Sequence, residues 1–152
     1  MDFNDRATGD AAILVAITQI LLSFATGTSI FGLLNPITLI QILLAGLIFW
    51  LLYSAVTFAI SRFLLDGHGT FAPVLRLTGF AYPTLLLVIF GNLLFNNTFL
   101  ILLVGGAWFV AIVANGLMYL ADMSLQKALV ASIGGYAGVV IIQSILGGLR
   151  IF

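Results

Sequence analysis

One stretch of the chain, DGHGTFAPVLRLTGFAYP (66–83), carries the residue types that could do chemistry. His68 stands between Gly67 and Gly69, two residues after Asp66, as a metal ligand or an acid–base group would. A catalytic zinc has three protein ligands, but the chain has a single histidine, no cysteine and no glutamate. A serine hydrolase needs a serine activated by a base, and no G-x-S-x-G or similar sequence occurs. We therefore predict that the protein is not an enzyme and has no catalytic residue, metal site or cofactor.

The composition of the chain predicts a membrane protein. Of its 152 residues, 62% are hydrophobic and only 7% are charged, whereas a soluble domain carries roughly 25% charged residues. Long apolar runs separate the few charges, which is typical of a polytopic membrane protein. The net charge is zero and there is no basic cluster, which argues against a nucleic-acid-binding surface. Membrane lipids and other membrane proteins remain as the expected partners.

The apolar segments of the sequence predict where the transmembrane helices lie. A bilayer core of about 30 Å needs on the order of 20 apolar residues per helix, and an open sheet edge cannot lie in lipid. We predict an all-α fold with a short cytoplasmic tail (1–10) and a single five-helix transmembrane domain (11–152). Asp10, Asn35 and Ser124 are the predicted N-caps of the first, second and fifth helices. The predicted spans are Ala11–Ala25, Pro36–Ser61, Leu77–Phe95, Thr98–Ala121 and Leu125–Leu149.

A short interfacial helix is predicted before the third span. The sequence TFAPVLRL suits a helix that is capped by Thr70, places Phe71 among its apolar residues and offers Arg76 to anionic headgroups. The helix must then pass through Pro83, since the residues after this proline are too few to cross the bilayer. We predict a kink between Gly79 and Pro83 and a hinge at Gly67 and Gly69, before the helix. Tyr82 is expected to lie at the level of the membrane interface.

Lysine and arginine predict the orientation. With five spans, one side of the membrane carries Arg6, Arg62, Arg76 and Lys127, and the other side carries only Arg150. The positive-inside rule then places the N-terminus in the cytoplasm and the C-terminus outside. The expected location is the plasma membrane of a prokaryotic cell.

Small residues and uncharged polar residues recur inside the spans. Pairs of small residues four apart let helix backbones approach closely, within the chain or against a partner. The amides Gln19, Gln41, Asn115 and Gln143 are predicted to form hydrogen bonds between helices, with a small polar path or a lipid-headgroup groove as the alternative. The predicted packing pairs are Gly134 with Gly138, Ala55 with Ala59, and Ala107 with Ala111.

Two blocks of the chain resemble the Yip family of Ypt/Rab-interacting membrane proteins, and its prokaryotic members in particular. The first block is GTFAPVLRLTGFAYPTLLL, and the second is WFVAIVANGLMYLADMSLQKALVAS with Trp108 early in the fourth span. The matching positions are Gly67 in the glycine-rich loop just before the first block, and Gly69, Phe71, Arg76, Gly79, Ala81 and Pro83 within it. The resemblance extends from about Pro36 onward and implies five spans with a cytoplasmic N-terminus. The chain departs from eukaryotic members, whose long N-terminal region it lacks, so the resemblance by itself does not imply GTPase binding.

Three functions compete at this point. The leading hypothesis is a non-enzymatic integral membrane protein of the Yip type that binds membrane partners or organises the membrane in trafficking. The alternative is an accessory subunit of a larger respiratory, photosynthetic or secretion complex. A small transporter or channel is disfavoured because none of the predicted spans has an ionisable residue near its centre.

Overall fold

The chain is helical throughout the part that the structure describes. The computed structural model describes residues 3–25, 27–87 and 98–148, and these ranges contain no strand. The all-α prediction is therefore confirmed for this part of the chain. The elements in order are α1 (Phe3–Ala25), α2 (Ile30–Leu33), α3 (Pro36–Ala59), the π-helical turn η1 (Ile60–Leu64), α4 (Phe71–Ala81), the 3-10 segment η2 (Tyr82–Leu86), α6 (Thr98–Leu120) and α7 (Leu125–Gly148).

Three of the described helices are long and apolar enough to cross a membrane. They contain the segments Arg6–Phe24, Pro36–Leu64 and Leu125–Ile145, and a shorter apolar helix covers Val104–Leu120. These segments agree with four of the five predicted spans. The predicted third span, Leu77–Phe95, lies partly outside the described residues, so the count of five stays a prediction.

The first helix begins earlier than predicted. α1 starts at Phe3, so Asp10 lies inside the helix and its prediction as the N-cap is wrong. The buried side chains of Ala11, Val15 and Thr18 then follow one face of the same helix.

The start of α3 and the start of α7 agree with the sequence. The Asn35 side chain accepts a hydrogen bond from the backbone N–H of Ile37 at 3.0 Å, and Pro36 is the first helical residue. The Ser124 hydroxyl accepts from the backbone N–H of Lys127 at 3.4 Å. Both predicted caps are therefore confirmed.

The second span continues past its predicted end at Ser61. The chain remains helical through η1 to Leu64, and Arg62 lies inside this π-helical turn. Its guanidinium donates to the backbone oxygen of Gly67 at 3.2 Å. The arginine therefore satisfies a carbonyl group near the helix end instead of stopping the helix.

The predicted interfacial helix and the start of the third span form one helix, α4. Thr70 is the N-cap residue, as predicted, but its side chain makes no capping hydrogen bond. α4 ends at Ala81 and the chain tightens into η2, which contains Pro83. The proline has no N–H for the carbonyl group of Gly79, and this oxygen accepts from the N–H of Tyr82 instead. The change of helix type lies inside the predicted kink region.

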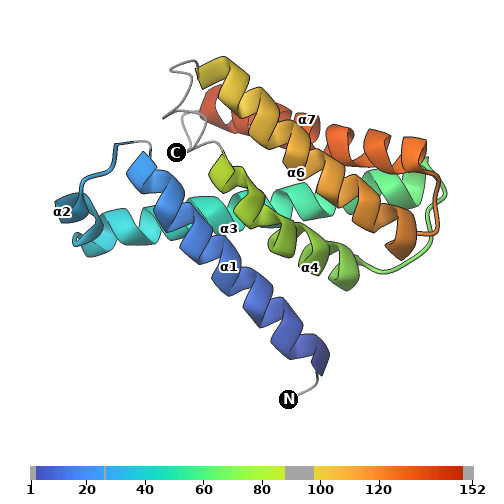
Figure 1. Cartoon of the computed structure of the whole chain (residues 1–152), viewed down its shortest axis with the longest axis horizontal. Coiled ribbons are helices and arrows are strands. Elements are labelled where there is room, and N and C mark those ends of the chain that lie inside the picture. The colour runs from blue at the N-terminus through green and yellow to red at the C-terminus, as the bar shows by residue number, and fades with distance from the viewer. Residues whose placement is uncertain (1–2, 26, 88–97, 149–152) are drawn as a thin grey trace.

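The helices pack around α3, which runs the length of the molecule (Figure 1). α7 packs along α3, and α6 packs against α7 and α4. α1 crosses α3 obliquely, lies beside α4 and also contacts η2. The connection after η1 and the connection between α6 and α7 meet at one end of the molecule (Figure 1). α3 is therefore the element on which a shared interior site can form.

Candidate functional site

A stripe of buried polar residues runs along the inner face of α3. Trp50, Tyr53, Ser54 and Thr57 are all buried, and Ser61 continues the stripe into η1. Their spacing of three and four residues places them on one face of a helix. This face meets α4 on one side and α7 on the other.

The first group of hydrogen bonds joins α3 to α4. The indole N–H of Trp50 donates to the Thr78 hydroxyl at 3.1 Å and to the backbone oxygen of Leu75 at 3.0 Å. The hydroxyl groups of Ser54 and Thr78 lie 2.6 Å apart, and Ser54 also donates to the backbone oxygen of Trp50. The Thr78 hydroxyl is fully buried, so these bonds replace the water that it cannot reach.

The second group joins α3, α7 and α6. The Tyr53 hydroxyl lies 2.7 Å from the Ser132 hydroxyl, and Ser132 donates to the backbone oxygen of Val110 at 3.1 Å. Trp50, Tyr53, Ser54, Thr78 and Ser132 are called the polar core below.

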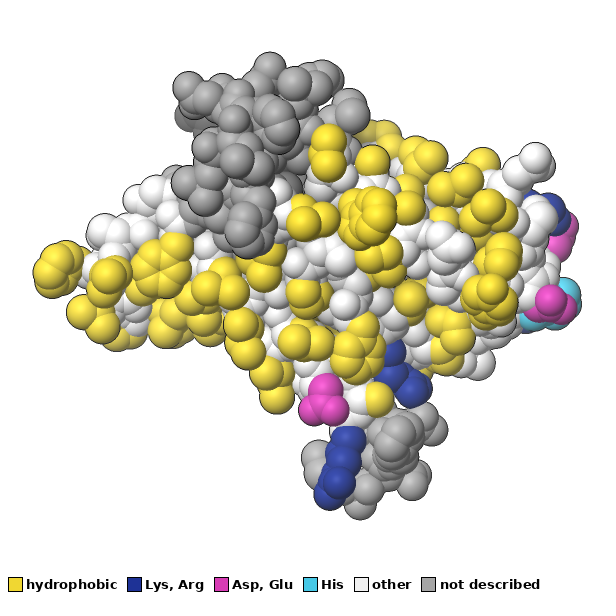
Figure 2. All heavy atoms as spheres, viewed as in Figure 1, with side chains coloured by type: hydrophobic (Ala, Val, Ile, Leu, Met, Phe, Trp, Pro, Cys, Tyr) yellow, Lys and Arg dark blue, Asp and Glu magenta, His cyan; other side chains and the backbone are white. Residues whose placement is uncertain are grey.

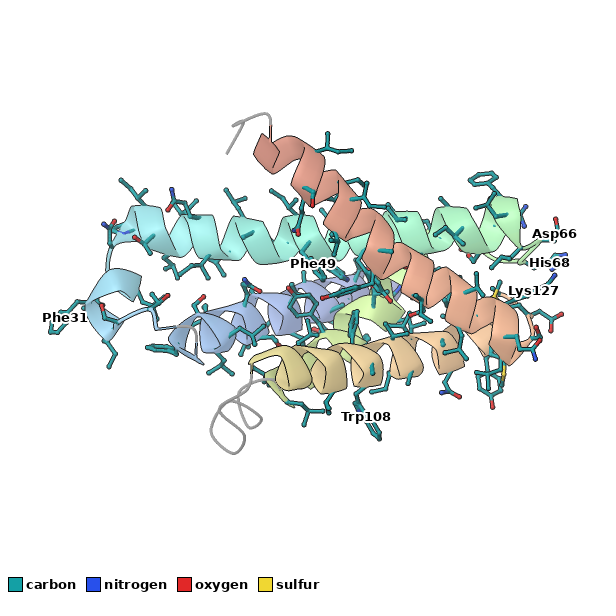
Figure 3. All side chains as sticks on the ribbon, turned by 90° about the horizontal axis from the view of Figure 1, so that it is seen from above. Phe31, Phe49, Asp66, His68, Trp108 and Lys127 are labelled. Carbon is teal, nitrogen blue, oxygen red and sulfur yellow. The ribbon has the colours of Figure 1, made fainter. Side chains whose placement is uncertain are left out.

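A third hydrogen bond connects α1 with η2. The Tyr82 hydroxyl donates to Gln19 Oε1 at 3.1 Å. Only 3% of Tyr82 is exposed, so its ring packs inside the bundle, and its interfacial depth stays a prediction. Phe49 lies centrally among the helices (Figure 3), with its ring 6.2 Å from Tyr53, 6.1 Å from Tyr82 and 6.4 Å from Tyr136. Aromatic packing thus links the hydrogen-bonded groups.

The chemistry of the polar core is neutral. Its members are hydroxyl groups and one indole N–H, which form hydrogen bonds but carry no charge at neutral pH. In the described part of the chain, no three His, Cys, Asp or Glu residues come close enough to hold a metal ion. The arrangement holds α3, α4, α6 and α7 in position relative to one another, and its members include no acid–base pair.

The predicted packing glycines of α7 lie against α3. A Cβ atom at Gly134 would come within 2.7 Å of Ile60, and one at Gly138 within 2.7 Å of Val56. Gly135, which lies between these two glycines in the sequence, faces the Thr57 side chain even more closely. Close approach of α7 to α3 depends on these three glycines.

The predicted alanine pairs lie nearer the surface. Ala55 is exposed and Ala59 is half-buried on α3. Ala107 and Ala111 line a groove of about 540 Å³ between α6 and α7, together with Gly106, Val110, Leu129, Ile133, Tyr136 and Ala137. The groove is apolar apart from the hydroxyl of Tyr136 and the backbone of its small residues.

The glycines around His68 belong to a closed loop. The N–H of Gly67 donates to the backbone oxygen of Ser61, and the N–H of His68 donates to that of Ala121, both at 2.8 Å. A Cβ atom at Gly67 would lie 2.5 Å from Met123, and Gly69 has a φ of +123°. The glycines therefore provide close approach and a left-handed turn. Residues 65–70 together with residues 121–124 are called the clasp below.

The His68 side chain itself is exposed at the end of the molecule, near Asp66 and Lys127 (Figure 3). Lys127 reaches across to donate to the backbone oxygen of Leu65 at 3.0 Å. Charged side chains on the face in Figure 2 lie at this end and along the first half of α1.

The other residues of the predicted hinge and interface join α4 to its neighbours. The Phe71 ring meets Phe58 edge to face at 5.7 Å. Arg76 is half-buried. A Cβ atom at Gly79 would lie 2.7 Å from Ala11 and 3.1 Å from Trp50, so α4 meets α1 and α3 at this glycine. Pro83 is half-buried in η2.

Of the four amides expected between helices, only Gln19 has a partner on another described element. Asn115 donates to the backbone oxygen of Ala111 in its own helix at 2.9 Å. Gln41, Asn115 and Gln143 are all exposed. For these three, the prediction of hydrogen bonds between helices of the chain is wrong, because each lies on an outward face.

Among the residues of the polar core, the sequence analysis missed Trp50, Tyr53 and Thr78. A signal for two of them was present, since Gly46, Trp50, Tyr53, Thr57 and Ser61 recur at helical spacing in an otherwise apolar segment. Thr78 had no such signal, because its role depends on where α4 lies against α3.

Comparison with known proteins identifies one family. The Yip1 domain matches residues 6–147 of the chain. Neither a protein of curated function nor a solved structure matches it. The match confirms the resemblance and extends it toward the N-terminus, into α1.

Proposed function

Because the chain belongs to the Yip family of membrane proteins, we propose that it is a non-enzymatic five-span membrane protein that acts through helix contacts with other membrane proteins or in organising the membrane. The family is generally non-enzymatic. The proposal includes a prokaryotic plasma membrane, an N-terminus in the cytoplasm and a C-terminus outside.

The observation that carries this proposal is how the polar groups are used. The hydrogen bonds of the polar core connect α3, α4, α6 and α7. No Asp, Glu, Lys or Arg belongs to it. A bundle of this kind is a rigid scaffold with apolar outer faces, which suits contact with lipids and with other helices.

The proposed orientation is supported by the clasp. Arg62 and Lys127 both donate to carbonyl oxygens of the loop after η1, which groups two of the positive charges at one end of the bundle. Positive charge near short loops is retained in the cytoplasm.

Native mass measurement of the protein extracted in its own lipids tests the proposal. We expect the chain to migrate in a defined assembly with itself or with another integral membrane protein. Replacing Gly79 with leucine should reduce that assembly, because it disturbs α4 against α1 and α3. A chain that is monomeric in native membranes, and that leaves lipid organisation unchanged in reconstituted vesicles, would contradict the proposal.

The alternative of an accessory subunit gains support from the exposed amides Gln41, Asn115 and Gln143 on three different helices. Amides that face hydrocarbon are costly unless a neighbour bonds them. Fixed stoichiometry with a much larger complex in the same mass measurement would favour this alternative, whereas a homogeneous homo-oligomer would exclude it.

The transporter alternative can be tested separately. The groove between α6 and α7 is apolar, and a selective path for ions needs polar or charged groups along it. We expect vesicles that contain the protein to show no solute uptake or current above empty vesicles.

A further inference from the structure

One outward face of α6 combines aromatic, small and amide side chains. Val104 and Trp108 are 60% and 58% exposed, and Tyr119 is 79% exposed. Asn115 is exposed and Ala111 is half-buried on the same side. The spacing of three and four residues puts these five residues in one stripe, called the α6 face below. Trp108 points away from the bundle in Figure 3.

Asn115 is the residue of this face that needs a partner. Its Nδ2 donates one hydrogen bond to Ala111 in the same helix. The amide has a second N–H and an acceptor oxygen, and neither has a hydrogen-bond partner in the part of the chain that the structure describes. Ser144 on α7 differs, because its single hydroxyl donor is satisfied by the backbone oxygen of Val140.

The position of Asn115 makes lipid a poor neighbour. It lies five residues before Leu120, the last residue of α6, which is about 7 Å along the helix axis. Its side chain is too short to reach water as a lysine or arginine does. An unsatisfied amide in hydrocarbon is unfavourable, so the α6 face is expected to be covered by a group that both donates and accepts hydrogen bonds.

A second copy of the same chain meets these requirements. An amide is both donor and acceptor, so two Asn115 side chains can satisfy each other across a two-fold axis along the membrane normal. That axis places two α6 helices side by side in the same orientation. The α6 face carries no charge that would repel its copy, and Ala111, one turn from Asn115, permits close approach.

We propose that the α6 face is the contact of a symmetric homodimer, in which the Asn115 side chains of the two copies hydrogen-bond to each other. Trp108 and Tyr119 pack on either side of this bond. The inference rests on the proposed function, for which it names a second copy of the chain as the partner. It resembles the use of a buried asparagine to set the register of paired helices.

Single-cysteine cross-linking in native membranes tests the geometry, because the chain has no cysteine of its own. Ala111→Cys is expected to give a disulfide-linked dimer on mild oxidation. Leu51→Cys on α3 and Val140→Cys on α7, both 45% exposed, serve as controls on other faces. Cross-linking at Ala111 at least fivefold above both controls supports the proposal. Equal or stronger cross-linking at either control overturns it.

Asparagine substitutions test the hydrogen bond in the full chain. Asn115→Leu is expected to weaken dimerisation in lipid vesicles by about 3- to 20-fold, the range for interhelical hydrogen bonds in membranes. Asn115→Gln keeps the amide and should retain most of the dimer. Gln143→Leu removes another exposed amide and should have no effect. A dimer that is unchanged by Asn115→Leu contradicts the proposal, and the cross-linking test does not depend on this variant.

The two proposals can fail separately. If the chain forms no homodimer but binds a different integral membrane protein, the homodimer proposal is overturned. The proposed function then still stands. A homodimer with solute-dependent uptake supports the α6 contact and overturns the proposed function.

Discussion

Hydrogen bonds of individual hydroxyl groups contribute to the packing of the helices in this bundle. Lipid tails are as apolar as leucine, so burying leucine between helices gains little in a membrane. Hydrogen bonds such as Tyr53 with Ser132 and Ser54 with Thr78 therefore matter more to the choice of helix neighbours. Glycines act with them, because the helices must be close for short side chains to meet.

Removing the Tyr53 hydroxyl tests this role. Tyr53→Phe is expected to lower the free energy of unfolding in lipid or mild detergent by about 0.6 to 1.7 kcal/mol, the span of measured interhelical hydrogen bonds. Tyr119→Phe is the matched control, since Tyr119 is exposed and should tolerate the change. Stability would be followed by reversible unfolding. Equal effects of both substitutions would show that the Ser132 contact contributes nothing.

Gly135 tests the close approach of α7 to α3. A Cβ atom there would clash with the Thr57 side chain, whereas one at Gly106 meets nothing within 4 Å. Gly135→Ala is expected to reduce the free energy of unfolding by about 1 to 3 kcal/mol through overpacking. Gly106→Ala should leave stability unchanged or raise it by up to about 1 kcal/mol, because alanine favours the helix. A stabilising Gly135→Ala substitution would contradict this packing.

At the scale of elements, the clasp explains why the residues that hinted at catalysis occur together. Glycines at 67 and 69 let the loop pass under Met123 and beside Leu120. The exposed His68 contributes its backbone N–H, not its imidazole, to this contact. The loop therefore joins the end of η1 to the connection between α6 and α7.

Hydrogen exchange tests the clasp. Gly69→Ala places a side chain at a φ of +123°, which is strained for any residue with a Cβ atom. We expect faster exchange of the His68 amide hydrogen, which is bonded to Ala121. His68→Ala removes only the exposed side chain and should leave exchange at the neighbouring amides unchanged. Protection that persists in Gly69→Ala would argue against the clasp.

Sequence reasoning located the apolar helices and two of their caps, because both follow from local chemistry. The Asn35–Pro36 pair and Ser124 act within a few residues of themselves. The start of α1 at Phe3 and the end of η1 at Leu64 were missed, since polar residues near helix ends are also compatible with loops. The glycines of α7 could be chosen from their spacing. The pairing of Ser54 with Thr78 could not, because it depends on how α4 lies across α3.

At the scale of the whole molecule, the charged groups and the helix ends support the proposed orientation. The loop after η1 and the connection between α6 and α7 lie at the same end (Figure 1). In the proposed five-span arrangement, both connections are expected to face the cytoplasm together with the N-terminus.

Labelling of single cysteines with a membrane-impermeant maleimide tests this topology. His68→Cys and Gln126→Cys are expected to react only when the cytoplasmic face is accessible, as in inverted vesicles. Ser29→Cys, before α2, should react in intact cells. All three positions are exposed. Reaction of Ser29→Cys and His68→Cys from the same side would exclude an odd number of crossings between them and overturn the five-span arrangement.

The continuous helical segment from Pro36 to Leu64 affects how well the protein fits bilayers of different thickness. Its 29 residues extend about 43 Å at 1.5 Å per residue, well beyond a hydrocarbon core of about 30 Å. This hydrophobic mismatch costs a fraction of a kcal/mol per Å, and tilting the rod or thickening the surrounding bilayer relieves it. Trp50 and Tyr53 sit on this rod and are bonded to α4 and α7. Bilayer thickness is thereby coupled to the arrangement of the whole bundle, and thicker regions of the membrane become its preferred environment.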